Sequence, residues 1–184
     1  MKKSIILTTF GVIILGVVVL AFLGNDTANT PQASETKDIK ELVQNYSVGD
    51  IENEQASISS HELIVTDSED NQLTYELPED EFFVSIAPFI NQTHPCDIHS
   101  LTGCQGEMVN EEFEVYIEDS NGNVVVEQTM KTPANGFIDL WVPRDDTYQV
   151  TIKHEDKITE SEFSTFENDN TCITTMQLID NKEA

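Results

Sequence analysis

The second half of this 184-residue chain alternates apolar and polar residues with a period of two, which restricts its fold more than any other feature. Residues 113–117 alternate Phe, Val and Ile with Glu and Tyr, and residues 148–152 alternate Tyr, Val and Ile with Gln and Thr. Successive side chains of a strand point to opposite faces of a sheet, so both segments are predicted to be half-buried strands. Asn121-Gly122 is a strong hairpin signal and leads into a further strand at 124–129.

Three more extended segments complete the predicted sheet structure. They cover residues 137–142, 159–166 and 172–178, and Pro143 stops the first of them. Six short strands separated by turns predict an antiparallel β-sandwich of the immunoglobulin-like or transthyretin-like kind. Roughly ninety residues suffice for one such core.

The last predicted strand places Cys172 on an inward face. Cys172, Thr174, Met176 and Leu178 share one face at period two, and the apolar Leu178 predicts that this face looks into the core. Met176 lies roughly 13 Å along the strand from Cys172, so the two sulfurs do not reach one ion. We therefore interpret Met176 as core packing.

The residues before the sandwich predict a smaller α+β region. Residues 36–46 place apolar side chains at helical spacing and predict one short amphipathic helix. Residues 62–66 and 73–77 flank an Asp- and Asn-containing turn and predict a β-hairpin. Residues 82–90 form a third extended segment, and Pro88 within it suits an edge strand or a strand end.

The N-terminus predicts a membrane-spanning helix. Lys2 and Lys3 precede Ser4 to Leu23, an uncharged apolar run whose helix would be roughly 30 Å long, the thickness of the hydrocarbon core of a bilayer. The lysines predict an inside N-terminus and an exported remainder. A cleaved signal peptide is the alternative, but the residues after the run fit a cleavage site poorly. We expect anchoring at the extracytoplasmic face of the membrane.

These predictions divide the chain into four parts. They are an anchor or signal segment at 1–24, a flexible tether at 25–35, a small N-terminal α+β region at 36–92, and a C-terminal β-sandwich at 93–180 that carries the cysteine site. The predicted fold class is therefore mainly β, with a small helix and a transmembrane helix before the sandwich.

The charge of the chain excludes nucleic acid as a partner. There are 34 Asp and Glu residues against nine Lys and Arg, and two of those nine precede the apolar run. Binding to phosphate depends on clustered basic side chains, which this chain does not have. We interpret the acidic residues as a solvated surface in an ionic environment.

The segment Asn91 to Glu107 predicts a soft-metal or redox site. It holds His94, Cys96, His99 and Cys104, and the third thiol, Cys172, lies far downstream. Thiolate and imidazole donors select Cu(I), Zn(II) or related soft ions. Zinc is disfavoured, because the gap from Cys96 to Cys104 is wider than the paired spacings of common zinc sites.

Three thiols in an exported chain also permit a disulfide with one cysteine left over. All three pairings remain open from the sequence. Two thiols that close to a disulfide release two electrons, enough to reduce two Cu(II) ions. The alternative function is a surface-anchored β-sandwich interaction module in which the disulfide is purely structural. No hydrolase, phosphate-loop or dinucleotide motif is present. We expect a non-enzymatic metal-binding protein, with a cupric reductase or thiol oxidoreductase as the enzymatic alternative.

Three segments in order resemble one known family. The runs FFVSIAPFINQTHPCDIHSLTGCQGE, NGFIDLWVPRD and TCITTMQL resemble the CueP family of periplasmic copper-binding proteins, and the resemblance extends from about Leu63 to Leu178. It implies an extracytoplasmic protein of copper resistance and copper supply. It also implies that Cys96, Cys104 and Cys172 are the functional thiols, with Cys104 and Cys172 the core of the copper chemistry.

The resemblance further implies Cu(II) reduction and delivery of copper to a secreted superoxide dismutase. His94 and His99 fall inside the matching motif and are candidate metal ligands beside the cysteines. A thiol–disulfide oxidoreductase and a second copy of the chain are further candidate partners. The predicted anchor and the acidic composition depart from the familiar periplasmic members, so the superoxide dismutase is the partner least readily carried over.

Overall fold

The computed structural model describes residues 33–182. The predicted anchor or signal segment at 1–24 lies outside this range, as does most of the tether predicted at 25–35. No helix within residues 33–182 has the length and apolar composition needed to cross a bilayer.

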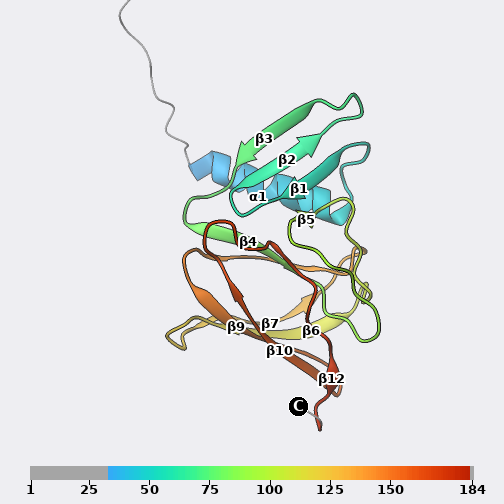
Figure 1. Cartoon of the computed structure of the whole chain (residues 1–184), viewed down its shortest axis with the longest axis vertical. Coiled ribbons are helices and arrows are strands. Elements are labelled where there is room, and N and C mark those ends of the chain that lie inside the picture. Colours follow the sequence, from blue (N-terminus) through green and yellow to red (C-terminus); the bar gives the residue numbers. More distant parts are fainter. Residues whose placement is uncertain (1–32, 183–184) are drawn as a thin grey trace, which may run out of the picture. The chain divides into compact units, whose positions relative to one another are not determined.

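One helix precedes twelve strands in the described part of the chain (Figure 1). The helix is α1 (Ala33–Val48). The strands are β1 (Gln55–Ile58), β2 (Glu62–Thr66), β3 (Gln72–Glu76), β4 (Glu81–Ile86), β5 (His99–Ser100), β6 (Glu112–Glu118), β7 (Val124–Lys131), β8 (Ile138–Pro143), β9 (Thr147–His154), β10 (Lys157–Ser164), β11 (Cys172–Ile173) and β12 (Ile179–Asp180). The chain is thus mainly β, as the alternating sequence predicts.

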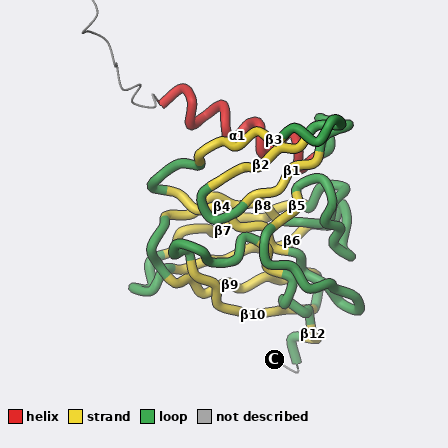
Figure 2. The backbone as a smooth tube through the Cα atoms, turned by 45° about the horizontal axis from the view of Figure 1, so that its top comes forward, coloured by secondary structure: helices red, strands yellow, loops and turns green. Residues whose placement is uncertain are grey.

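The strands form three sheets. Their orders are β3-β2-β1-β5, β12-β10-β9-β6-β7 and β11-β4-β8. The three-stranded sheet lies between the other two, with α1, β1 and β2 on one side and β6, β9 and β10 on the other (Figures 1 and 2). Both faces of β4 and β8 are therefore covered.

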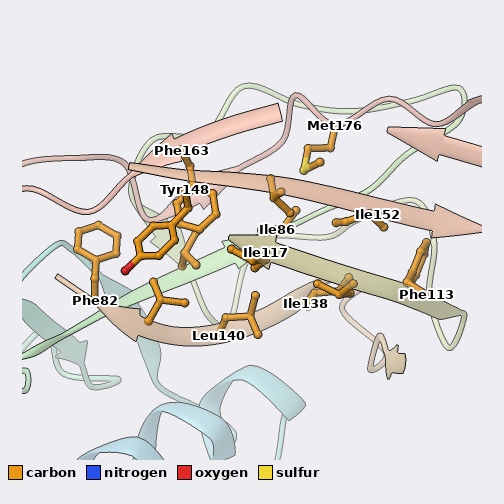
Figure 3. Close-up of a cluster of buried hydrophobic side chains, with 14 of the residues drawn as sticks. Phe82, Ile86, Phe113, Ile117, Ile138, Leu140, Tyr148, Ile152, Phe163 and Met176 are labelled. Atoms are coloured by element: carbon orange, nitrogen blue, oxygen red, sulfur yellow. The ribbon is translucent and has the colours of Figure 1, made fainter. Parts of the chain in front are cut away.

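The main hydrophobic core lies between the three-stranded and five-stranded sheets. Phe82 and Ile86 from β4 meet Ile117 and Ile152 from β6 and β9, and Met176 closes the same cluster (Figure 3). Met176 is fully buried, which confirms its interpretation as core packing. The hairpin at Asn121-Gly122 is also confirmed, since β6 pairs with β7 around it.

A second core lies on the opposite face of β4. Ile39, Val43 and Tyr46 of α1 share one buried helical stripe and pack with Leu63 and Phe83. The helix ends at Val48, and the next residue, Gly49, has a φ of +82°, a conformation that residues with a Cβ rarely adopt. This end places the last turn of α1 beside β8, where Ser47 donates a hydrogen bond to Asp139.

Several sequence-based details were wrong. The helix is longer than the predicted 36–46 and begins inside the predicted tether. Of the two interpretations of Pro88, the edge strand is wrong and the strand end is confirmed, because β4 is the central strand of its sheet and ends at Ile86, before the proline. The predicted last strand 172–178 is regular only over β11, which pairs in parallel with β4, unlike the other strand pairs described.

The proposed boundary at residue 92 does not coincide with a change of sheet. β4 pairs with β8 and β11 of the sandwich, whereas β5 pairs with β1. Residues 33–182 all belong to one compact unit. The strands therefore cross the boundary in both directions.

A substitution at Ile152 tests the assignment of the main hydrophobic core. It is fully buried in the centre of β9, so Ile152→Ala is expected to lower the free energy of unfolding by about 2 to 5 kcal/mol through lost burial and a residual cavity. The matched control is Val124→Ala, because Val124 is 50% exposed on β7 and should change stability by about 0.5 kcal/mol or less. Denaturant unfolding measures both, and equal losses would contradict the assigned core.

Candidate metal centre

The centre is built on a row of three side chains that crosses the three-stranded sheet. Cys172 on β11 is in register with Ser85 on β4, and Ser85 is in register with Asp139 on β8. Residues in register on neighbouring strands place their side chains on the same face. That face is also the one that carries Phe83, on the side of α1. The sheet therefore fixes a sulfur, a hydroxyl and a carboxylate in one line.

His99 reaches this row from the neighbouring sheet. It pairs with Ile58 of β1, and its backbone N–H donates to Thr171 Oγ1 at 3.0 Å. Thr171 in turn donates through the same oxygen to the carbonyl of Ile58 at 2.6 Å. One buried threonine, directly before Cys172, therefore ties His99 to the strand end that carries the thiol.

The loop around β5 brings the other two thiols. The carbonyl of Asp97 accepts hydrogen bonds from the N–H groups of Thr171 and Cys172 at 3.0 and 3.2 Å, which fixes the residue after Cys96 beside β11. The N–H of Cys104 donates to the carbonyl of Ser100 at 3.0 Å and turns the chain back toward the same point. The distant sulfur of Cys172 and the two loop sulfurs thereby meet.

Four soft donor atoms converge at this point. The sulfurs of Cys96, Cys104 and Cys172 and one ring nitrogen of His99 all lie within 4.8 Å of one another. The sulfurs of Cys96 and Cys104 are 3.5 Å apart, and His99 Nδ1 lies 3.4 Å from Cys172 Sγ. All three cysteines are free thiols. The arrangement can hold a soft metal ion or form a disulfide.

His94 lies beside this group but is not one of the four. Its ring packs edge-on against Phe137 with centroids 6.3 Å apart, and its Nε2 atom is buried without a hydrogen-bond partner. A buried imidazole nitrogen normally has a hydrogen-bond partner. The unpaired Nε2 atom of His94, next to the thiol cluster, is therefore free to bind a metal ion or a proton. Proximity to His94 also contributes to the lowered pKa of Cys104.

Apolar side chains exclude water from the inner side of the cluster. Phe137 and Cys172 are buried, and the Phe137 ring centroid lies 4.5 Å from that of His99. Cys96 and Cys104 are half-buried. The site therefore has a dry wall behind Cys172 and an accessible side at the two loop thiols.

The three thiols differ in their affinity for a proton. Hydrogen bonding by the Cys172 thiol and the nearby His99 lowers the pKa of Cys104 to about 2, although burial acts against this shift. The interaction with Cys104, followed by burial, raises the pKa of Cys172, and burial raises that of Cys96. Cys104 is thus the thiolate of the group, and a thiolate is the form that binds metal.

A close contact between two glycines holds the loop after Cys104 in place. The N–H of Gly106 donates to the carbonyl of Asn135 at 2.7 Å. A Cβ on Gly106 would lie 2.5 Å from the carbonyl oxygen of Gly136, and Gly136 itself has a φ of +77°. Both positions require glycine, which explains why the loop can pack directly against the segment that supplies Phe137.

Glu107 fixes the loop before His94. Its carboxylate accepts hydrogen bonds from the N–H groups of Ile90, Asn91 and Gln92 at 2.6, 2.8 and 3.3 Å. Partial burial acts to raise the pKa of Glu107, but these bonds and one from the Asn91 side chain outweigh it and lower the pKa to about 2. One carboxylate therefore connects the two ends of the loop that carries His94, Cys96, His99 and Cys104.

Of the five candidate ligands predicted from the sequence, the structure brings four together, namely Cys96, His99, Cys104 and Cys172. His94 lies adjacent to the other four. Ser85, Asp139 and Thr171, which position those side chains, were not identified from the sequence. Ser85 and Asp139 each interrupt an otherwise apolar buried strand, and that interruption was the available signal.

Fold and site together define a β-sandwich protein with a partly buried cysteine and histidine cluster that can hold a soft metal ion. The family model described as "Periplasmic copper-binding protein CueP" matches residues 39–177. A solved structure described as "Crystal Structure of S.CueP" is 32% identical, with a TM-score of 0.73, and the match covers 82% of this chain and all of that one. A search of curated proteins finds no match.

The chain belongs to the CueP family of periplasmic copper-binding proteins. The resemblance inferred from the three sequence motifs is confirmed. An extracytoplasmic location agrees with the periplasmic description of the family.

The unequal thiols give a spectroscopic prediction. With its pKa lowered to about 2, Cys104 is expected to contribute one thiolate to the ultraviolet absorbance of the reduced, metal-free protein at about pH 5. Cys104→Ser should abolish this absorbance, and the control Cys96→Ser should retain it. Thiolate absorbance that first develops above roughly pH 8, as for an ordinary cysteine, would contradict the assignment.

Glu107 gives a prediction on stability and pH. Because its pKa falls from 4.5 to about 2 on folding, its stabilising contribution is complete above pH 4.5 and is lost as the pH falls toward about 2. Glu107→Gln is therefore expected to unfold at lower urea concentration than the wild type at about pH 7, with a difference that shrinks below pH 4.5. Glu127→Gln, on an exposed position of β7, is the control. A difference that is independent of pH would refute this role.

Proposed function

We propose that this chain is an extracytoplasmic protein that binds Cu(I) through Cys96, Cys104 and Cys172, with His99 as a fourth donor. The convergence of these four donor atoms within 4.8 Å carries the proposal. They come from β5, the loop around it and β11, which are far apart in sequence. Such convergence in a chain of a copper-binding family supports a metal site rather than unrelated buried thiols.

The chemistry of the donors favours Cu(I). Thiolate sulfur is a soft ligand that prefers Cu(I) to Cu(II), and imidazole binds either ion. A three-cysteine, one-histidine set also suits Zn(II), which binds it as a tetrahedral structural ion. The accessible side at Cys96 and Cys104 suits an ion that is taken up and released, and the family description specifies copper.

The distance between Cys96 and Cys104 supports reduction of Cu(II) as a second activity. Their sulfurs are 3.5 Å apart, and an S–S bond of about 2.05 Å requires only a small approach. Closing this bond from the Cys104 thiolate and the Cys96 thiol releases one proton and two electrons, and the electrons reduce two Cu(II) ions to Cu(I). Cys172 and His99 then remain as donors for the Cu(I) that is formed.

In the cell, these properties would serve copper resistance and the supply of copper to a secreted cuproenzyme, such as a superoxide dismutase. A thiol–disulfide oxidoreductase would restore the thiols after each round of reduction. His94, next to the accessible thiols, is the donor we assign to copper entry and release. Anchoring through the N-terminal apolar segment and self-association stay predictions.

A Cu(I) titration tests the ligand set. Cys104→Ser/Cys172→Ser is expected to weaken Cu(I) binding by at least about 100-fold in competition with a chelator, because it removes the thiolate and the buried sulfur. His99→Ala should weaken binding less. The matched control His154→Ala should not, since His154 instead bonds the backbone carbonyl of Glu112 on β6.

Three outcomes would contradict the proposal. Unchanged Cu(I) affinity in the double cysteine variant would reject the ligands. Tighter retention of Zn(II) than of Cu(I) by the reduced wild type would reject the metal. If no soft metal binds the reduced protein at all, the thiols are structural, as in an interaction module.

A further inference from the structure

Asp139 is a half-buried carboxylate without an ion-pair partner among residues 33–182. It lies on β8 between the buried Ile138 and Leu140, and none of the cations described lies within salt-bridge distance of it. Its Oδ1 atom instead accepts a hydrogen bond from Ser85 Oγ at 2.5 Å, and its Oδ2 atom accepts one from Ser47. The proposed copper ligands do not by themselves explain why an acid occupies this position.

The hydrogen bonds of Ser85 have a defined direction. A serine hydroxyl carries one proton, and an ionised carboxylate can only accept, so Ser85 must donate to Asp139. Ser85 Oγ also lies 3.3 Å from His99 Nε2. Because the serine proton is already committed, this second contact requires His99 to donate from Nε2.

The direction fixes the tautomer of His99. A neutral imidazole carries one proton, and with that proton on Nε2 the Nδ1 atom has a free lone pair. Nδ1 is the atom that lies 3.4 Å from Cys172 Sγ and faces the sulfur cluster. Ser85 and His99 are both fully buried, so water does not replace either partner.

We propose that Asp139, acting through Ser85, is a positioning residue that holds His99 as the Nε2–H tautomer and so presents Nδ1 as the metal-binding atom. The metal part of this inference rests on the proposed function. Metal-binding histidines commonly donate their second nitrogen to an acceptor, which fixes the ring and increases its basicity. Here a serine relays that effect from the carboxylate.

Ser47 and Asn135 complete the arrangement on the other side of Asp139. Asn135 Nδ2 donates to Ser47 Oγ at 3.0 Å, so the Ser47 hydroxyl is directed at the carboxylate. Asp139 thereby receives hydroxyl donors from α1 and from β4 and is held as an acceptor on both sides. Through Asp139 and Ser85, a chain of hydrogen bonds thus links the last turn of α1 to His99, a proposed metal ligand more than fifty residues later in the sequence.

¹⁵N NMR of the histidine ring nitrogens in the reduced, metal-free protein tests the proposed tautomer of His99 without copper. The wild type is expected to show His99 as the Nε2–H tautomer. Ser85→Ala removes the acceptor of that proton. Asp139→Ala frees the Ser85 hydroxyl to donate to Nε2. Both variants are expected to shift His99 toward the Nδ1–H tautomer, whereas the control Ser161→Ala on β10 leaves it unchanged.

Copper binding provides the second measurement. Each of the two variants should bind Cu(I) about 10- to 100-fold more weakly than the wild type, the usual effect of losing a partner of a metal ligand. An Nδ1–H tautomer in the wild type would overturn the inference even if neither variant folds. Folded variants that keep the Nε2–H tautomer would also overturn it.

The two proposals fail separately. If the tautomer shifts as expected but the wild type binds no Cu(I), the positioning role stands and the proposed function falls. If Cu(I) binds through the cysteines but substitution of Ser85 or Asp139 leaves the His99 tautomer unchanged, the proposed function stands and the positioning role falls.

Discussion

The parallel pairing of β11 with β4 is the constraint on which the site depends. It sets Cys172 opposite Ser85, and the antiparallel pairing of β4 with β8 sets Ser85 opposite Asp139. The position of the buried sulfur is therefore determined by the backbone of a sheet whose two faces are both covered by hydrophobic cores. A shift of one residue in the register of β11 would turn Cys172 to the opposite face and remove it from the cluster.

Local sequence patterns predicted the elements better than their partners. The period-two segments and the Asn121-Gly122 turn correctly identified β6, β7 and β9, because alternation reports directly on a half-covered sheet. Alternation could not predict which strands β4 and β11 pair with. β4 is buried on both faces, so it does not alternate, and β11 has only two residues and depends on a partner almost ninety positions earlier.

For the candidate site too, the sequence predicted the local features but not the long-range contacts. Clustered cysteines and histidines in one loop identified the soft donors, since their chemistry is visible in the residue types alone. Their convergence with Cys172 required a long-range strand pairing that no local pattern encodes. The hydrogen bonds through Ser85 and Asp139 were further from reach, because they depend on cross-strand register and on the last turn of α1.

X-ray absorption of the Cu(I)-loaded, reduced protein measures whether the sulfur of Cys172 and the donors of the loop around β5 bind the same ion. We expect a first coordination shell dominated by sulfur, with one imidazole nitrogen, and the loss of one sulfur in Cys172→Ser. A shell of nitrogen and oxygen alone, or one that Cys172→Ser leaves unchanged, would contradict this expectation.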